Sequence, residues 1–169
     1  MKKESPSIDQ WLKEAKAHES APKIGMYLTH NGTVRQTAKA KVRYGAEDTR
    51  EVTGMYFSYD EEKVNAIIAD TYKMEGIYYI KVWLNEGHLN MGDDIMYVLI
   101  GGDIRPRVVD ALQYLVGRVK NECVVETELK PKGMGVWAAK RIRIRMEGED
   151  ADVESIYHRY FIQFLSTGG

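Results

Sequence analysis

Residues 76–122 decide the fold, and they read GIYYIKVWLNEGHLNMGDDIMYVLIGGDIRPRVVDALQYLVGRVKNE. Two parts of this stretch, GIYYIKVWL (76–84) and DIMYVLIGG (94–102), are rich in β-branched and aromatic residues, which is typical of strands. The segment NEGHLNMGD between them carries turn residues and predicts a hairpin connection. The first half of the stretch therefore predicts two antiparallel strands.

The second half of the stretch predicts a helix. Asp103 is expected to cap it, and Pro106 is tolerated in its first turn. A buried stripe follows at helical spacing, formed by Val108, Leu112, Leu115, Val116 and Val119. Arg105 at the start and Lys120 near the end lie outside this stripe, about 22 Å apart along the helix axis. One ligand could contact both cations only if a loop or a second subunit closed that gap.

The segments before residue 76 supply the other elements. Ser7, followed three residues later by Gln10, forms a capping-box pattern that predicts a short surface helix. The remaining predictions are a strand at 23–30, a polar and basic excursion, a strand at 52–60 and a helix at 60–74 with an acidic first turn.

A further strand is expected after the helix that begins near Arg105. From the strand at 52–60 onward, the element order is therefore βαββαβ. This run predicts an α+β protein with a ferredoxin-like core and an added antiparallel β subdomain. Farther along, RIRIRM (141–146) alternates as a strand does, and residues 152–165 carry an apolar helical stripe. The expected organisation is one domain at 1–138, with a strand and helix extension at 139–169 packed on it.

Composition excludes several classes of protein. A formal net charge of −1 argues against a generally basic nucleic-acid binder. No apolar run approaches the roughly 20 residues that span a bilayer, and the N-terminus lacks a signal-peptide core. The single cysteine, Cys123, cannot form an internal disulfide and is interpreted as a packing residue at a helix end. A cytoplasmic protein that contacts neither membrane nor nucleic acid is expected.

Motifs for metal or hydrolytic chemistry are missing from the sequence. Its four histidines, His18, His30, His88 and His158, show no ligand spacing, and neither CxxC nor HExxH occurs. GxSxG and GxxxxGK are absent as well. What stands out instead is a set of cations where loops meet strand or helix ends: Arg35, Arg105, Lys120, Lys130 and Lys132. Each alone is more often a solvated surface residue, but together they suit a small anionic ligand.

The order of several short motifs resembles the large, catalytic subunit of molybdopterin synthase over residues 7–138. These motifs are GTVR (32–35), EGHLNMGDDIMYVLI (86–100), the R-x4-DA-x-QYL pattern from Arg105 to Leu115 with Lys120 after it, and KPKG (130–133) with Trp137 beyond. The resemblance implies an α/β-hammerhead type of fold. It also implies an enzyme that installs the two dithiolene sulfurs of molybdopterin in cyclic pyranopterin monophosphate, with no permanently bound cofactor.

The resemblance further implies partners and residue roles. The sulfur donor is a small ubiquitin-like subunit with a C-terminal Gly-Gly thiocarboxylate, and the large subunit is a homodimer with one small subunit at each end. Thr33, Val34 and Arg35 resemble the loop that contacts the substrate. Arg105 resembles an arginine of the pterin phosphate pocket. Lys120 resembles the lysine beside the incoming tail, where an amine can transfer protons or attack an acyl carbon.

Two positions depart from the family pattern. Ile104 stands where a histidine usually precedes the arginine, and His30 is the nearest candidate to replace it. Glu126 and Thr127 stand where a tryptophan and a second lysine are expected, and Lys130 and Lys132 are the candidates to replace that lysine. The alternative hypothesis is a noncatalytic binding or regulatory homologue that keeps the dimeric fold and an anion pocket.

Overall fold

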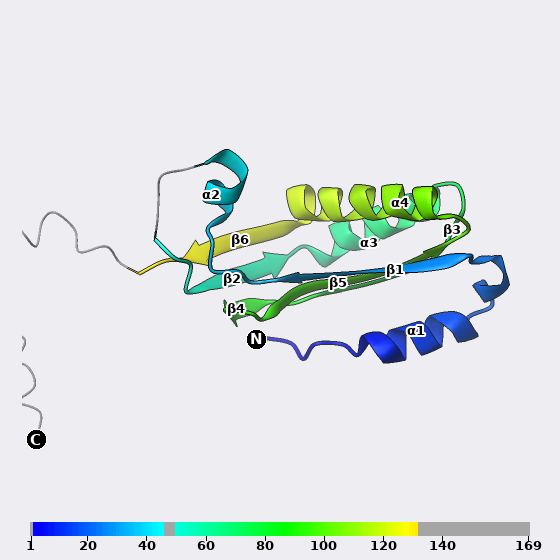
Figure 1. Ribbon diagram of the computed structural model, residues 1–169, viewed down its shortest axis with the longest axis horizontal. Helices are drawn as coiled ribbons and strands as arrows, with labels where there is room; N and C mark the ends of the chain where they lie inside the picture. Colours follow the sequence, from blue (N-terminus) through cyan, green and yellow to red (C-terminus); the bar gives the residue numbers. More distant parts are fainter. Residues whose placement is uncertain (1, 46–49, 132–169) are drawn as a thin grey trace, which may run out of the picture. The chain divides into compact units, whose positions relative to one another are not determined.

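The computed structural model describes residues 2–45 and 50–131 (Figure 1). Its helices are α1 (Ile8–Ala17), α2 (Lys39–Tyr44), α3 (Glu61–Tyr72) and α4 (Arg105–Arg118), with a 3-10 turn at Ala21–Lys23 and a π-helical turn at Val119–Cys123. Its strands are β1 (Met26–Thr33), β2 (Gly54–Tyr59), β3 (Ile77–Leu84), β4 (Gly87–Asn90), β5 (Asp94–Gly102) and β6 (Val124–Leu129). The expected boundary at 138, the strand RIRIRM and the helix at 152–165 lie outside the described residues.

The strands form two antiparallel sheets of three strands each, in the orders β1-β5-β3 and β4-β2-β6. The α+β class and the added antiparallel β subdomain are confirmed. Within the βαββαβ run, two expected strand pairs are present, β3 with β5 and β2 with β6. The sheets separate where β2 would meet β5, because β1 occupies that edge of β5 and β4 occupies the free edge of β2.

The sheet formed by β1, β5 and β3 is covered on both faces (Figure 1). Helices α3 and α4 pack over one face, with Ile67, Ile100 and Leu115 at the centre of the main core. Helix α1 packs over the other face through Trp11 and Ala15, which contact Leu99. Because both faces are covered, β5 is apolar along most of its length rather than alternating.

Local signals explain how two of the helices begin. The Ser7 side chain accepts a hydrogen bond from the backbone N–H of Gln10, as the capping pattern predicts. Asp60 caps α3 in the same way by accepting from the N–H of Lys63. The predicted cap at Asp103 is wrong by one residue, because Ile104 occupies the cap position of α4. Asp103 instead accepts from the N–H of Ile104 and from the Arg107 guanidinium.

Two segments are more regular than their sequences predict. Strands β3 and β5 pair with each other, and the connection between them contains a further strand, β4. β4 does not join this sheet and pairs instead with β2 in the other sheet. The basic excursion after β1 contains the short helix α2, which ends at Gly45 in the left-handed conformation, φ +64°. In the ranges 2–45 and 50–131, no helix has the length and apolarity to cross a membrane.

Candidate functional site

The topology brings the end of β1 to the end of α4. Strand β1 runs antiparallel to β5, and α4 follows β5 and packs back along both strands. The last residues of β1 and of α4 therefore lie at the same end of the sheet (Figure 1). A cavity of about 170 Å³ lies there, and we name it the Arg35–Lys120 cavity. Its lining residues are Thr33, Arg35, Lys39, Val42, Arg43, Met55, Ile95, Lys120, Glu126 and Glu128.

Three residues that the sequence assigned to one site meet at this cavity: Thr33, Arg35 and Lys120. Arg35 is exposed, and its Nε donates to the backbone oxygen of Thr37 at 3.1 Å. Lys120 lies on the π-helical turn, where the buried side chains of Val119 and Cys123 anchor the backbone. Such turns are frequent at functional sites. Here the turn leaves Lys120 half-buried at the cavity wall.

Arg105 lies at the opposite end of α4. It is the first residue of the helix, whose 14 residues correspond to about 21 Å. Its side chain is exposed and does not line the cavity. Within one chain, the structure therefore brings Arg35 and Lys120 together and keeps Arg105 apart from them.

The other predicted substrate-binding residues are divided. Val34 is buried in the main core, and its backbone N–H and carbonyl bond to Asp93 and Gly92 in the turn before β5. Lys130 follows β6 and does not line the Arg35–Lys120 cavity. Lys132 lies outside the described residues. Val34 therefore fixes the backbone between Thr33 and Arg35 rather than offering a side chain to a ligand.

His30 lies on β1 close to the cavity. It shares the face of the strand that carries Leu28 and Gly32, and Leu28 packs against the main core under the helices. The His30 Nε2 atom is buried and has no hydrogen-bond partner in the described part of the chain. Burial, and after it the positive charge of Lys120, lowers the pKa of His30 from its ordinary value of 6.5. A neutral imidazole near Lys120 can accept a proton.

Sequence reasoning missed the contribution of α2 and β6 to the cavity. Lys39, Val42 and Arg43 come from α2, and Glu126 and Glu128 come from β6. The basic run KAKVR was visible in the sequence, but nothing in it predicted that this segment folds against β6. The sequence presented Glu126 only as a departure from a family pattern and gave Glu128 no role, whereas both contact Lys39 of α2 in the structure.

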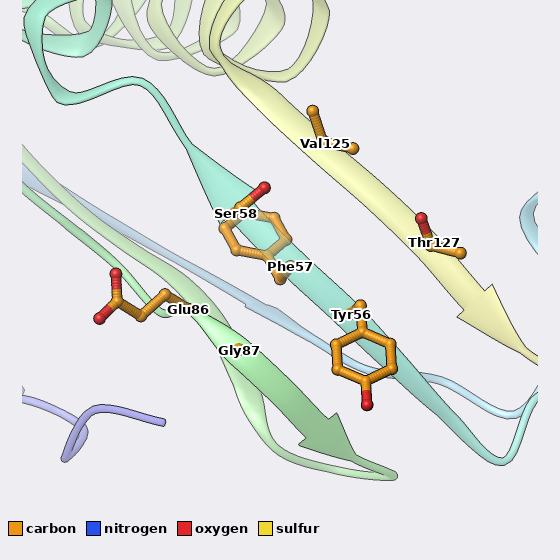
Figure 2. A pocket seen from close by; sticks show the side chains of 7 residues that line it. All are labelled: Tyr56, Phe57, Ser58, Glu86, Gly87, Val125 and Thr127. Atoms are coloured by element: carbon orange, nitrogen blue, oxygen red, sulfur yellow. The ribbon is translucent and has the colours of Figure 1, made fainter. Parts of the chain in front are cut away.

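A second, larger cavity of about 490 Å³ lies against the sheet formed by β4, β2 and β6 (Figure 2). Figure 2 shows side chains from neighbouring β2 and β6 along it, including Tyr56, Val125 and Thr127. Among the described residues that line it, Glu86 is the only charged one. Because none of these described residues is a cation, this cavity is a poorer site for an anion than the Arg35–Lys120 cavity.

Cys123 and the acidic groups do not form a metal or nucleophile site in the described ranges. Cys123 is buried in the main core, where burial raises the pKa of its thiol. A thiol with a raised pKa is a poor nucleophile at neutral pH, in agreement with a packing role. The described residues contain no group of three or more His, Cys, Asp or Glu side chains placed to hold a metal ion.

Comparison with solved structures shows that the fold is shared. Molybdopterin synthase from Staphylococcus aureus aligns with a TM-score of 0.60 and 18% identity, over 77% of this chain and 89% of that one. A molybdopterin biosynthesis MoaE protein from Burkholderia ambifaria aligns with a TM-score of 0.57 and 18% identity, over 82% and 92%. A complex of subunits 1 and 2 of molybdopterin-converting factor from Helicobacter pylori aligns with a TM-score of 0.51 and 17% identity, over 75% of this chain and 82% of that one.

The family comparison identifies the chain. No curated protein matches it. The model of the MoaE protein family, however, matches residues 2–122, which include α1 to α4 and the residues of the cavity up to Lys120. The chain therefore belongs to the MoaE protein family, and this membership supports a biosynthetic enzyme role in the formation of the molybdenum cofactor.

Proposed function

We propose that this chain is the catalytic subunit of a molybdopterin synthase. It transfers sulfur from the C-terminal thiocarboxylate of a small ubiquitin-like subunit to cyclic pyranopterin monophosphate and so forms the molybdopterin dithiolene. The observation that carries the proposal is that Arg35 and Lys120 line one cavity. Family membership supports the reaction class, and the cavity is the location that we propose for it in this chain.

The chemistry of the cavity suits this substrate. A cyclic phosphate is an anion, and the Arg35 guanidinium can donate charge-assisted hydrogen bonds to its oxygens. Lys120 is half-buried, and partial removal from water strengthens its interaction with a negative charge. Its Nζ can give a proton to, or take one from, the groups that change charge during sulfur transfer, and His30 lies close enough to feel its charge.

The proposed partners are the small subunit and a second copy of this chain. The aligned structure from Helicobacter pylori is a complex of subunits 1 and 2 of molybdopterin-converting factor, which supports a small-subunit partner. In a homodimer, Arg105 of one chain would reach the cavity of the other chain. The length of α4, which separates Arg105 from Lys120 within one chain, would then not prevent the two residues from contacting the same ligand. The proposed assembly is a cytoplasmic heterotetramer with one small subunit at each end of the dimer.

The test is molybdopterin formation by the purified chain. The reaction contains cyclic pyranopterin monophosphate and a small subunit that carries a C-terminal Gly-Gly thiocarboxylate. Lys120→Ala is expected to lower the turnover rate about 100-fold or more, the range for loss of a proton-transferring group. Lys13→Ala, an exposed position on α1, is the matched control and is expected to keep full activity. No product despite binding of the small subunit would favour the noncatalytic homologue.

A further inference from the structure

Lys39 ties α2 to β6 through two separate contacts. Its backbone N–H donates to the Glu128 carboxylate at 2.7 Å. Its side-chain Nζ donates to Oε2 of Glu126 at 2.9 Å. Because all three residues line the Arg35–Lys120 cavity, these contacts place the Lys39 ammonium at the cavity wall.

The two members of this ion pair differ in burial. The Glu126 side chain is 13% exposed, whereas the Lys39 side chain is 42% exposed. A carboxylate in this position requires a cation, because a charge removed from water without a partner is costly. Glu126 therefore keeps the Lys39 ammonium near β6, while the exposed part of Lys39 stays open to a ligand.

The pair leaves hydrogen-bonding capacity unused. An ammonium group has three N–H donors. Within the described part of the chain, Glu126 is the only hydrogen-bond partner of the Lys39 Nζ. Two donors therefore remain for a ligand in the cavity, and this ligand can bind without displacing Glu126.

The charge of the wall defines the class of ligand. Four of the described lining residues are cations, Arg35, Lys39, Arg43 and Lys120, and two are carboxylates, Glu126 and Glu128. Glu126 and Glu128 both contact Lys39, so Lys39 lies at the boundary between the acidic and the basic parts of the wall. An anion that binds Arg35 or Lys120 has Lys39 as a further cation along the same cavity.

We propose that Lys39 is an anion-binding residue of this cavity and that Glu126 is the positioning residue that holds its ammonium there. The ligand class is a phosphate-bearing small molecule, which rests on the proposed function for its identity as cyclic pyranopterin monophosphate. The second lysine of the site then comes from α2, which precedes α4 in the chain, and not from Lys130 or Lys132.

The experiment compares charge reversals at neighbouring lysines of α2. Lys39→Glu is expected to raise the Kd for cyclic pyranopterin monophosphate about tenfold or more, measured by equilibrium dialysis without the small subunit. Lys41 is exposed and does not line the cavity, and Lys41→Glu changes the net charge by the same amount as Lys39→Glu. Its Kd is expected to stay within about twofold of the unmodified chain. Lys39→Ala, which introduces no new charge, is expected to weaken binding less than Lys39→Glu.

The role of Glu126 is tested by exchange of the two charges. The double variant Lys39→Glu with Glu126→Lys restores the ion pair and returns a cation to the cavity from β6. It is expected to recover most of the affinity that Lys39→Glu loses; recovered stability without recovered affinity would instead show that the pair has a purely structural role. Circular dichroism checks that each variant is folded, and Lys39→Ala serves as the test if the exchange variant is not.

The results separate this inference from the proposed function. Equal weakening by Lys39→Glu and Lys41→Glu, or no weakening by either, overturns the role of Lys39 while turnover by the unmodified chain still supports the synthase. If the unmodified chain does not bind cyclic pyranopterin monophosphate, the same variants are titrated with inorganic pyrophosphate. If Lys39→Glu weakens pyrophosphate binding and Lys41→Glu does not, the anion site is supported but the synthase function is not. If the unmodified chain binds neither cyclic pyranopterin monophosphate nor pyrophosphate, both the anion site and the synthase function are overturned.

Discussion

Arg35 and Lys120 line one cavity, although they follow elements from opposite parts of the described chain, β1 and α4. Strand β5 explains this, because β1 pairs antiparallel with it and α4 packs back along it. The same geometry sends Arg105 to the other end of α4. The three cations can therefore serve one ligand only if a second chain supplies Arg105.

Subunit mixing tests the shared site. If Arg105 acts across a dimer, the single variants Arg105→Gln and Lys120→Ala are each expected to be nearly inactive in molybdopterin formation. A mixture refolded from equal amounts is expected to regain about a quarter of the unmodified activity, because half of the dimers are mixed and each has one intact site. Recovery does not occur if both residues act within one chain, and full activity of Arg105→Gln would remove Arg105 from the site.

The pH dependence of stability is expected to report on His30. Its pKa is lowered in the folded chain, so below its ordinary value of 6.5 the unfolded chain binds more protons at this position than the folded chain. The unfolding free energy therefore falls as the pH decreases from 6.5 toward the lowered pKa. His30→Gln is expected to lose less stability than the unmodified chain between about pH 7.5 and about pH 5.5 in urea unfolding.

The contribution of Lys120 to this pKa can be measured separately. Lys120→Ala removes a nearby positive charge, so the pKa of His30 is expected to rise in an NMR titration of its ring protons. Lys23→Ala, at the far end of β1, is the matched control and is expected to leave that pKa unchanged. An unchanged His30 titration in Lys120→Ala would place the two groups too far apart for proton transfer.

Two glycine substitutions are expected to change stability in opposite directions. Gly117 lies in α4, and apart from its chain neighbours and the backbone of its own helix, no atom of the described residues lies within 4 Å of the position that a Cβ would take. Gly117→Ala is therefore expected to stabilise by about 0.5–1 kcal/mol through helix propensity. At Gly102, the new Cβ would lie 2.6 Å from the Gly76 carbonyl oxygen and 2.6 Å from Val108 Cγ2. Gly102→Ala is expected to destabilise by about 1–3 kcal/mol. Urea unfolding of both variants measures this. Stabilisation by Gly102→Ala would contradict the close packing described around Gly102, and destabilisation by Gly117→Ala would contradict the open space described at Gly117.

Asn85 is expected to be important for stability because its side chain connects three backbone segments. It is fully buried, and Oδ1 accepts from the N–H groups of Lys3 at 2.8 Å and Glu86 at 2.9 Å. Its Nδ2 donates to the Asp94 carbonyl oxygen at 2.7 Å. Asn85→Ala is expected to cost about 1–3 kcal/mol of unfolding free energy because these groups lose their partner.

The control for this prediction is Asn65→Ala, an exposed position on α3. Alanine favours the helix slightly more than asparagine does, so the control is expected to leave the unfolding free energy equal or slightly higher. Thermal unfolding followed by circular dichroism compares the two variants. Equal stabilities would show that the buried Asn85 network contributes little.

The sequence by itself determined the α+β class, the β3 and β5 hairpin and the helices α1, α3 and α4, because these depend on local periodicity and capping. It also identified Arg35 and Lys120 as candidates for one site. The residue types suggested only that cations at element ends suit an anion, and the resemblance to the large subunit of molybdopterin synthase assigned these two to one site.

Only the tertiary structure decided how the strands divide into two sheets and which cations share a cavity. β4 leaves its hairpin because its partner, β2, is distant in the sequence, and local turn residues carry no information about that pairing. Lys39 joins the site for the same reason: its partners Glu126 and Glu128 come from β6, the last strand in the described part of the chain. Contacts between distant segments depend on the packing of the whole core, which no local pattern in the sequence specifies.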